Sequence, residues 1–231
     1  MSRGGLDWRA VSQEAQEPTP SATVVVIRDA DAMEVLLLER TRGRGTWVFP
    51  GGKIDASDGP LDGDLWEPTA RRAAVREAQE EAALELDAQA LLPLSRWITP
   101  HMAPRRFDTL FFLARVGSDV DVRPDGGEMR SHRWWIPEAA LDAHQRDEIS
   151  LAPPTFVTIC SLLGHSRCDD AVNSLVEAEH ITFRPHICKD SSGQTCILYP
   201  GDAGYEHSAP DRAGARHRLW VLSDGWRYER D

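Results

Sequence analysis

The stretch REAQEEAAL, residues 76–84, places three glutamates at the helical spacings i, i+3 and i+4. Side chains at these spacings are neighbours on a helix, and each like-charged pair there destabilises it by about 0.2–0.5 kcal/mol. The whole segment 69–86 consists mostly of strong helix formers, so a helix is expected despite this repulsion. Such a helix needs either open solvent or a positive partner for Glu77, Glu80 and Glu81.

The arrangement of residues around this helix favours a positive partner. Successive residues lie about 100° apart, so the three glutamates share one side with small apolar residues. Arg72, Arg76 and Gln79 lie on the other side, and alanines form a stripe suited to packing on a sheet. Glu81 lies at the edge of that stripe and is expected to be partly buried. Burial and repulsion raise carboxylate pKa values, and one arginine cannot offset three charges, so the helix predicts a site for Mg²⁺ or Mn²⁺.

Composition narrows the class of partner. The formal net charge is −11, which disfavours a protein that grips nucleic-acid backbone and means that an acidic chain acting on phosphates needs a metal. No apolar run approaches the roughly 20 residues of a membrane span, and the start lacks the apolar core of a signal peptide. We expect a cytoplasmic protein with no nucleic-acid or membrane partner. Its cysteines form no CxxC pair and are interpreted as free thiols, with a disulfide as the alternative: Cys160, Cys168, Cys188 and Cys196.

Strand-like and helix-like segments alternate, which predicts a mixed α and β fold. The predicted strands are 22–29, 34–41, 46–53, 94–100, 106–117, 131–137, 180–187, 195–200 and a final hairpin over 217–229 that turns at Asp224-Gly225. The predicted helices are 69–86 with Thr69 as its N-cap, 137–147, 153–165 and 169–180. We expect a flexible N-terminal arm over 1–20, a compact domain over 21–148, and a C-terminal extension over 149–231 packed on that domain.

The glycines at 51–52, the loop after them and the glutamate helix resemble the Nudix box. That motif reads Gly, five residues, Glu, seven residues, then Arg-Glu-apolar-any-Glu-Glu-any-Gly-apolar. The matching positions are Gly52, Arg76, Glu77, Ala78, Glu80, Glu81 and Leu84.

The chain departs from this box in three places. Arg76 follows Gly52 by 24 positions where the motif has 14, so the loop holds ten extra residues. Glu67 lies one residue out of place for the first glutamate, and Ala83 replaces the late glycine. The insertion, VFPGGKID and WITPHMAPRRFDTLFFLARV are similar to the peroxisomal coenzyme A diphosphatase branch of the superfamily and its bacterial relatives.

The resemblance implies a Nudix α/β/α sandwich with a mixed sheet, here followed by a C-terminal α+β extension. It implies hydrolysis of the pyrophosphate bond of a small-molecule nucleoside diphosphate derivative, with Mg²⁺ or Mn²⁺ as cofactor. By this resemblance Glu77, Glu80, Glu81 and the Gly51 carbonyl bind metal. Glu77 alternatively accepts the proton of the attacking water, and Arg76 orients Glu80.

Further candidates lie outside the box. Glu128, after an Asp-Gly-Gly loop, is a candidate base or ligand, and the alternative is an exposed loop glutamate. Arg105 and Arg106 lie between two strands and are candidates for binding the outer phosphates of the substrate, with a surface turn as the alternative. Arg40 and Arg44 are similar cases near the box.

The eight tryptophans are expected to be mostly core residues. Trp47 and Trp97 are the candidates for walls of an adenine site. Trp134 and Trp135 are expected on opposite faces of one strand, while the final hairpin is expected to pack through its own two tryptophans.

Several substrates and one different class of function stay open at this stage. Coenzyme A or acyl-CoA is the first hypothesis, followed by ADP-ribose, dinucleotides such as NADH, and modified nucleotides. A Nudix-fold sensor that binds a nucleotide without cleaving it is the alternative from another class, and retention of all three helix glutamates favours the enzyme. The extension either covers the site or forms the contact of a homodimer.

Overall fold

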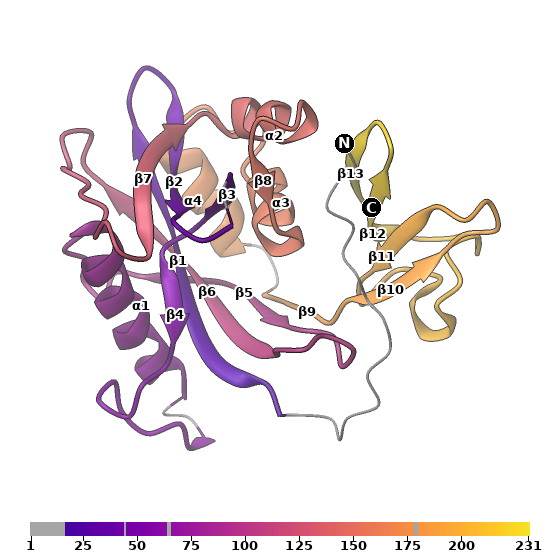
Figure 1. Cartoon of the computed structure of the whole chain (residues 1–231), viewed down its shortest axis with the longest axis horizontal. Coiled ribbons are helices and arrows are strands. Elements are labelled where there is room, and N and C mark those ends of the chain that lie inside the picture. Colours follow the sequence, from indigo (N-terminus) through magenta and orange to yellow (C-terminus); the bar gives the residue numbers. More distant parts are fainter. Residues whose placement is uncertain (1–16, 44, 64–65, 178–179) are drawn as a thin grey trace.

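The computed structural model describes residues 17–43, 45–63, 66–177 and 180–231. Most of the predicted N-terminal arm lies outside these ranges, and so does Arg44. The described part is built around a large mixed sheet with helices on both of its faces (Figure 1). This arrangement confirms the predicted α/β/α sandwich.

Within the described residues the main sheet has nine strands. In spatial order they are β8 (Ser150–Leu151), β3 (Thr46–Val48), β2 (Met33–Arg40), β1 (Thr19–Asp29), β6 (Phe107–Val116), β5 (Leu92–Ile98) and β9 (Ile181–Phe183), while β4 (Gly51–Lys53) pairs with β1 and β7 (Met129–Trp135) pairs with β2.

The centre of the sheet is the pair β1 and β6, which run parallel to each other. The central run ATVVVI of β1, residues 22–27, is buried on both faces except at the partly buried Thr23, as expected of a strand with neighbours on either side. Strands β1 and β2 form the predicted antiparallel hairpin. Strand β1 begins at Thr19, before the predicted start at residue 22, because Thr19 pairs with Phe107 of β6. Local sequence carries no signal for that long-range pairing.

Helix α1 (Trp66–Ala82) carries the glutamates and covers one face of the sheet. Its alanine stripe is fully buried against β1, β2 and β6, which confirms the predicted packing side. Thr69 is not the N-cap, because the helix begins three residues earlier; Thr69 is buried inside it, and its Oγ1 donates to the Pro60 carbonyl at 2.6 Å. The helix also ends earlier than predicted, since Ala83 adopts a φ of 54° and turns Leu84 back into the core.

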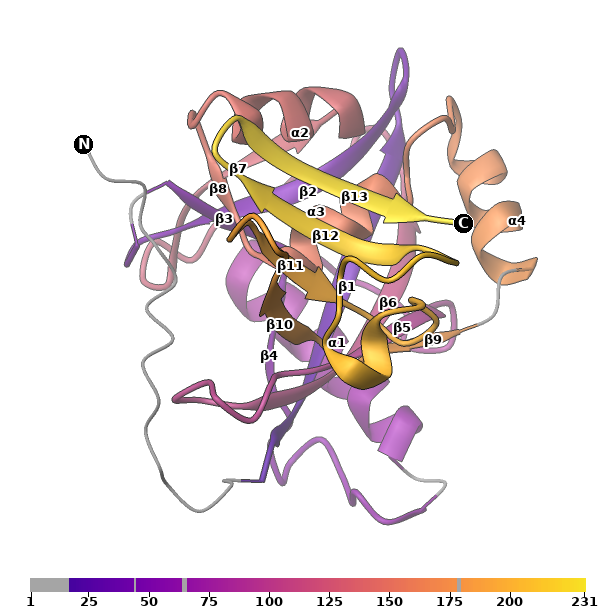
Figure 2. The same cartoon turned by 90° about the vertical axis from the view of Figure 1, so that its right-hand side faces the viewer.

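The other face of the sheet is covered by α2 (Pro137–Gln145), α3 (Pro153–Cys160), α4 (Cys168–Glu177) and a second sheet. Figure 2 shows this second sheet in front of the helices. Its strands are β10 (His186–Lys189), β11 (Thr195–Leu198), β12 (His217–Leu222) and β13 (Gly225–Arg230), in that order. The helices predicted over 153–165 and 169–180 and the strands predicted over 195–200 and 217–229 are confirmed, with shorter bounds. The single strand predicted over 180–187 is wrong, because the chain passes from one sheet to the other within it: β9 (Ile181–Phe183) belongs to the main sheet and β10 to the second.

Residues beyond 148 are joined to the main sheet as well as packed on it. Strand β8 pairs with β3, and β9 pairs with β5, both in parallel. The final hairpin is tied to α2 by Gln145, whose amide donates to the Trp226 carbonyl at 2.6 Å and accepts from the Trp226 amide at 2.8 Å. The ladder of that hairpin closes at Leu222 and Gly225, so its two-residue turn is Ser223-Asp224 rather than Asp224-Gly225.

The tryptophans and cysteines mostly follow the predictions. Trp134 and Trp135 contact the hydrophobic clusters on opposite faces of the sheet, as expected. Trp97 is 4% exposed and stacks on Phe183 with ring centroids 3.9 Å apart, so it is a core residue and not a wall of an adenine site. All four cysteines are free thiols. In the described part of the chain, no helix is both long and apolar enough to cross a bilayer.

Candidate active site

Arg76 is the centre of a cluster of acidic side chains at the middle of α1. Its Nη1 donates to Glu77 at 2.8 Å and to Glu80 at 3.0 Å. Its Nη2 donates to the Lys53 carbonyl at 2.9 Å, which ties the helix to β4. The guanidinium was expected on the solvated side of the helix, but these contacts hold it between the helix and the loop that precedes it.

The remaining donors of Arg76 bind a carboxylate that the sequence interpretation missed. Its Nε donates to Asp58 Oδ1 at 3.0 Å and its Nη2 to Asp58 Oδ2 at 2.9 Å, a bidentate pair. Asp58 is buried in the inserted loop and also accepts from the Asp55 amide at 2.8 Å. The Arg76 guanidinium lowers the Asp58 pKa against the opposing effect of burial, so the carboxylate is charged.

Asp58 occupies the position of the first glutamate in the box when the residues are counted forward from Gly52. The spacing counted backward from Arg76 leads instead to the neighbourhood of Glu67. In the structure Glu67 pairs with Arg71 one turn along the helix at 2.8 Å. The forward count from the glycine was the available signal, and the ten extra residues behind Asp58 obscured it.

Glu81 is the most buried of the helix glutamates, at 5% exposure, as its position on the helix predicts. Its Oε2 accepts a hydrogen bond from the Gly51 amide at 2.9 Å, so the Pro-Gly-Gly turn lies directly against it. Burial raises the pKa of Glu81 to about 8, with a further contribution from the nearby Glu77 charge and a smaller opposing one from Arg40. Glu77 also has a raised pKa, first because of burial and then because of Glu80 and Glu128.

The two glycines of the turn are required because neighbouring atoms approach their Cα positions too closely for a side chain. A Cβ on Gly51 would lie 2.5 Å from the Ala22 carbonyl oxygen. A Cβ on Gly52 would lie 2.4 Å from Glu77 Oε1. Both distances are far below van der Waals contact, so only glycine lets β4 lie against β1 and the glutamate helix at once.

Glu128 and Arg40 are brought to the same region by the sheet. Arg40 is the last residue of β2 and pairs across a bulge with Met129, the first residue of β7. Glu128 precedes that strand, is exposed, and its carbonyl accepts from the Thr41 amide at 2.8 Å. Arg40 and Glu128 also act electrostatically on Glu81. The geometry and these effects together place both candidates from outside the box near the helix glutamates.

Arg105, Arg106 and Trp47 are not brought to the glutamates. The two arginines belong to the β5–β6 loop at the Thr19 end of β1, about 13 Å along the strand from the level of Gly51. Arg105 is exposed, whereas Arg106 is 7% exposed and its Nε donates to the Thr99 carbonyl at 3.2 Å. Trp47 contacts the hydrophobic cluster on the face opposite α1, where its ring meets Trp135 edge-on at 6.0 Å.

The acidic cluster fits a divalent cation by the chemistry of its donors. In the described ranges no three acidic, imidazole or thiol side chains already converge closely enough to form a metal centre. Instead Glu77 and Glu80 share Arg76, and Glu81 accepts from a backbone amide. Two of these carboxylates nevertheless have raised pKa values because burial and repulsion oppose their charge. A hard cation bound to their oxygens would relieve both costs.

Comparison with known proteins places this geometry in a family. A model of the NUDIX domain matches residues 17–154, more than half of the chain. A NUDIX hydrolase from Alicyclobacillus acidocaldarius superposes with a TM-score of 0.63 at 24% identity, covering 72% of this chain and 100% of that one, which shows the same fold.

Curated relatives agree with the family model. The acyl-coenzyme A diphosphatase NUDT19 of Xenopus laevis is 35% identical over 138 residues, which are 56% of this chain and 36% of that protein. The Homo sapiens protein of the same name is 29% identical over 153 residues, covering 64% of this chain and 40% of its own. The matches thus span well under half the length of these relatives. The chain belongs to the NUDIX family of hydrolases.

Proposed function

We propose that this chain hydrolyses the pyrophosphate bond of coenzyme A or an acyl-coenzyme A, with Mg²⁺ or Mn²⁺ as cofactor. The observation that carries the proposal is the cluster in which Arg76 binds Asp58, Glu77 and Glu80 beside the buried Glu81. The substrate class is supported by the relatives described as acyl-coenzyme A diphosphatases. It is also supported by the resemblance of the inserted box to that branch.

The side chains of the cluster would divide the work between holding charge and moving a proton. Glu77, Glu80 and Glu81 would hold the divalent cation, which when bound supplies positive charge against the diphosphate and polarises water. Arg76, fixed by Asp58, keeps the Glu77 and Glu80 carboxylates beside each other. The water oxygen forms a bond to one phosphorus, the bridging P–O bond breaks, and the proton of the water passes to a carboxylate.

Two glutamates are candidates for accepting that proton. Burial raises the Glu77 pKa, which brings this carboxylate closer to the range in which a base works well near neutral pH. Glu128 is exposed and comes from a separate loop, so it could approach the substrate from the other side of the cluster. A comparison of the pH–rate profiles of E77Q and E128Q separates them, because only loss of the base removes the acidic limb.

Among the candidate substrate contacts, the geometry favours Arg40. Its charge acts on Glu81, so it lies near the position that a diphosphate would occupy beside the glutamates. Arg105 is exposed at the far end of β1 and is proposed for the outer phosphates of a long substrate. Arg106 and Trp47 have contacts of their own away from the cluster and are not included.

The experiment that tests the function is a substrate panel measured with Mg²⁺, with Mn²⁺ and with EDTA. The panel contains coenzyme A, acyl-CoA, ADP-ribose, NADH, a dinucleoside polyphosphate and a nucleoside triphosphate, and products are identified by mass spectrometry. We expect cation-dependent cleavage of coenzyme A or acyl-CoA into two monophosphates. Preferential cleavage of ADP-ribose or NADH would make that compound the proposed substrate in place of coenzyme A. Tight binding without cleavage of any member would favour a nucleotide sensor over an enzyme.

We further propose a cytoplasmic location and a C-terminal unit over 149–231. The four free thiols suit a reducing compartment. The unit shares a hydrophobic cluster with the main sheet, so we expect it to be required for folding; its contribution to a homodimer is tested by light scattering of the full chain.

A further inference from the structure

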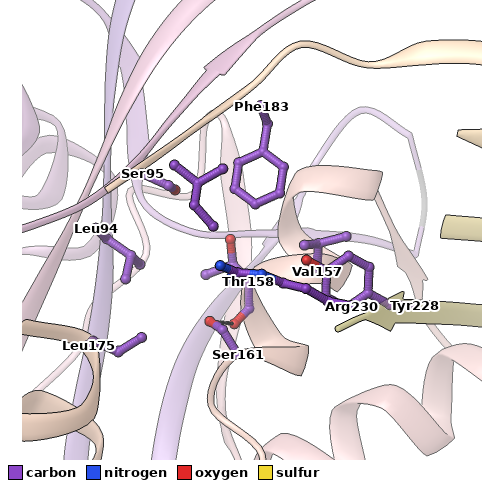
Figure 3. Close-up of a pocket in the computed structure, with 10 residues that line it drawn as sticks. Leu94, Ser95, Val157, Thr158, Ser161, Leu175, Phe183, Tyr228 and Arg230 are labelled. Carbon is purple, nitrogen blue, oxygen red and sulfur yellow. Dashed lines mark hydrogen bonds between the residues drawn. The ribbon is translucent and has the colours of Figure 1, made fainter. Parts of the chain in front are cut away.

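A cavity of about 170 Å³ lies on the face of the main sheet opposite α1. It is enclosed by β5 and β9 of the main sheet, by α3 and α4, and by β13 of the second sheet (Figure 3). The glutamate cluster lies on the other face, so this cavity is a separate site. None of the residues discussed for catalysis lines it.

Among the described residues that line the cavity there is one cationic group and no carboxylate. Arg230 extends from β13 into it and points toward Thr158 of α3 and Ser161, the residue after the end of that helix (Figure 3). Within the described part of the chain, no carboxylate forms an ion pair with Arg230. Arg230 is exposed, so its charge lies at the open side of the cavity, where a ligand entering from solvent would meet it.

Hydroxyl groups also line the cavity. Ser95, Thr158 and Ser161 line the same cavity. Ser95 Oγ accepts from the Trp97 indole at 3.1 Å, and Ser161 Oγ donates to the Thr158 carbonyl at 2.7 Å. These bonds hold Ser95 and Ser161 in place, and Ser95 keeps its hydroxyl proton to donate to a ligand.

The rest of the wall is apolar. Leu94, Leu175, Ile181 and Phe183 contribute apolar surface to the lining. Phe183 is 5% exposed and is stacked on Trp97, so this wall is rigid. The lining therefore combines one cation and a few hydroxyls with a mostly apolar wall, as in sites that orient small ligands by one polar end.

We propose that this cavity binds a small monocarboxylate with an apolar body of about four to six carbons. A cavity of about 150 Å³ accommodates a benzene molecule, which sets the size of the ligand. A carboxylate matches the two-pronged geometry of one guanidinium, whereas a phosphate dianion would call for more than one cationic partner. The apolar wall favours a ligand with a hydrocarbon tail over a compact inorganic anion.

Titration of the full chain with straight-chain carboxylates tests this site without reference to catalysis. We expect affinity to rise about fourfold per methylene from butyrate to hexanoate and to stop rising when the tail exceeds the cavity. Hexanamide, which has the same shape without the charge, should bind at least about tenfold more weakly. Amide resonances of Thr158 and Ser161 should shift on binding, while those of Glu77 to Glu81 should not.

Substitution of the cation separates a ligand contact from a structural one. Arg230→Gln should weaken hexanoate binding at least about tenfold, and Arg230→Lys should retain part of it. Arg227→Gln is the matched control, because Arg227 lies on the same strand, is exposed and pairs with Glu229 at 2.9 Å. Circular dichroism of each variant checks the fold.

The opposing outcomes are distinct. The proposal would be overturned if carboxylates did not bind saturably, or if Arg230→Gln left their binding unchanged. Arg230 would then be a partner of the carbonyl end of α3. Inorganic phosphate that binds more tightly than hexanoate would overturn the ligand class. Because the readout is binding, these results stand whatever the substrate panel shows.

Discussion

Asp58 binds Arg76 through two parallel hydrogen bonds of 3.0 and 2.9 Å, and this pair fixes the arginine that contacts Glu77 and Glu80. The loop that contains Asp58 is thereby coupled to the carboxylates of the helix. A change at Asp58 should consequently affect both folding and turnover.

We expect Asp58→Asn to lower the free energy of unfolding by about 2 kcal/mol, because a buried charge-assisted pair loses one of its charges. Turnover should fall more than KM rises, since the carboxylates lose their alignment without losing substrate contacts. Urea denaturation and steady-state kinetics measure the two effects. Asp62→Asn is the control, because Asp62 is exposed in the same loop; equal behaviour of the two variants would remove the role assigned to Asp58.

Glu80 should matter to activity and not to stability. Its side chain is 59% exposed, and exposed ion pairs such as the one with Arg76 contribute little. We predict that Glu80→Gln reduces turnover by about 100-fold or more while the midpoint of urea denaturation stays within error of the parent. Glu85→Gln makes the same chemical change at an exposed position just beyond the helix and should keep full activity. Parental rates in Glu80→Gln would refute the site assignment.

The buried Glu81 should make stability depend on pH. Its folded-state pKa is about 8, raised by burial from the ordinary value of 4.5. Between these values the folded chain keeps a proton that the unfolded chain has lost, so the free energy of unfolding falls as pH rises through this window. Glu81→Gln resembles the protonated form. Its free energy of unfolding should therefore fall by about 2–4 kcal/mol less than that of the parent between pH 5 and pH 8.

Cation addition provides the second arm of this test. At pH 8 in EDTA the parent should be at its least stable, and excess Mg²⁺ or Mn²⁺ should restore stability by binding the charged carboxylates. The same cations should stabilise Glu81→Gln much less. Identical pH and cation responses in both proteins would mean that Glu81 is not a cation ligand.

Elements with strong local patterns could be predicted from the sequence, and contacts between distant segments could not. The helix of glutamates, its alanine stripe and the burial of Glu81 follow from periodicity. The early start of β1 and the pairing of β9 with β5 depend on strands far away in the chain.

The same distinction applies within the site. Glu77, Glu80 and Glu81 were found because they lie within one and a half turns of one helix. Asp58 was missed because a loop of variable length separates it from Arg76, so spacing gives no register for the pair. Thr69 has the side chain of an N-cap, but α1 already begins at Trp66, and the Thr69 hydroxyl binds the Pro60 carbonyl from inside the helix.

Ala83 should be a destabilising residue where it stands. It ends α1 with a φ of 54°, a conformation that costs a residue with a side chain about 1–2 kcal/mol and costs glycine nothing sterically. We expect Ala83→Gly to raise the free energy of unfolding by about 0.5–1 kcal/mol after the added entropy of the unfolded glycine is included. Gln79→Gly, at an exposed position inside the helix, should lower it by a similar amount. Urea denaturation distinguishes the opposite signs, and destabilisation by both changes would contradict this explanation of the helix end.

His217 should give the chain a sensitivity to acid. It is buried beside Phe183 and Tyr199, and burial lowers its pKa below the ordinary value of 6.5. Its Nδ1 lies 2.7 Å from the Pro200 carbonyl, to which it donates, while Nε2 has no partner among the described residues. Below about pH 6.5 the unfolded chain therefore takes up a proton that the folded chain resists, and the free energy of unfolding falls as pH falls.

Asparagine at this position keeps a donor for Pro200 and cannot be protonated. We expect His217→Asn to lower the free energy of unfolding by about 1–2 kcal/mol at pH 7 through lost ring packing. Between pH 7 and pH 5, however, its free energy of unfolding should fall less than that of the parent. His101→Asn, at an exposed position, should leave both the stability at pH 7 and its slope unchanged. If the free energy of unfolding of His217→Asn depended on pH as steeply as that of the parent, groups other than His217 would cause the acid sensitivity. Removal of the imidazole would then have left the number of protons taken up on unfolding unchanged.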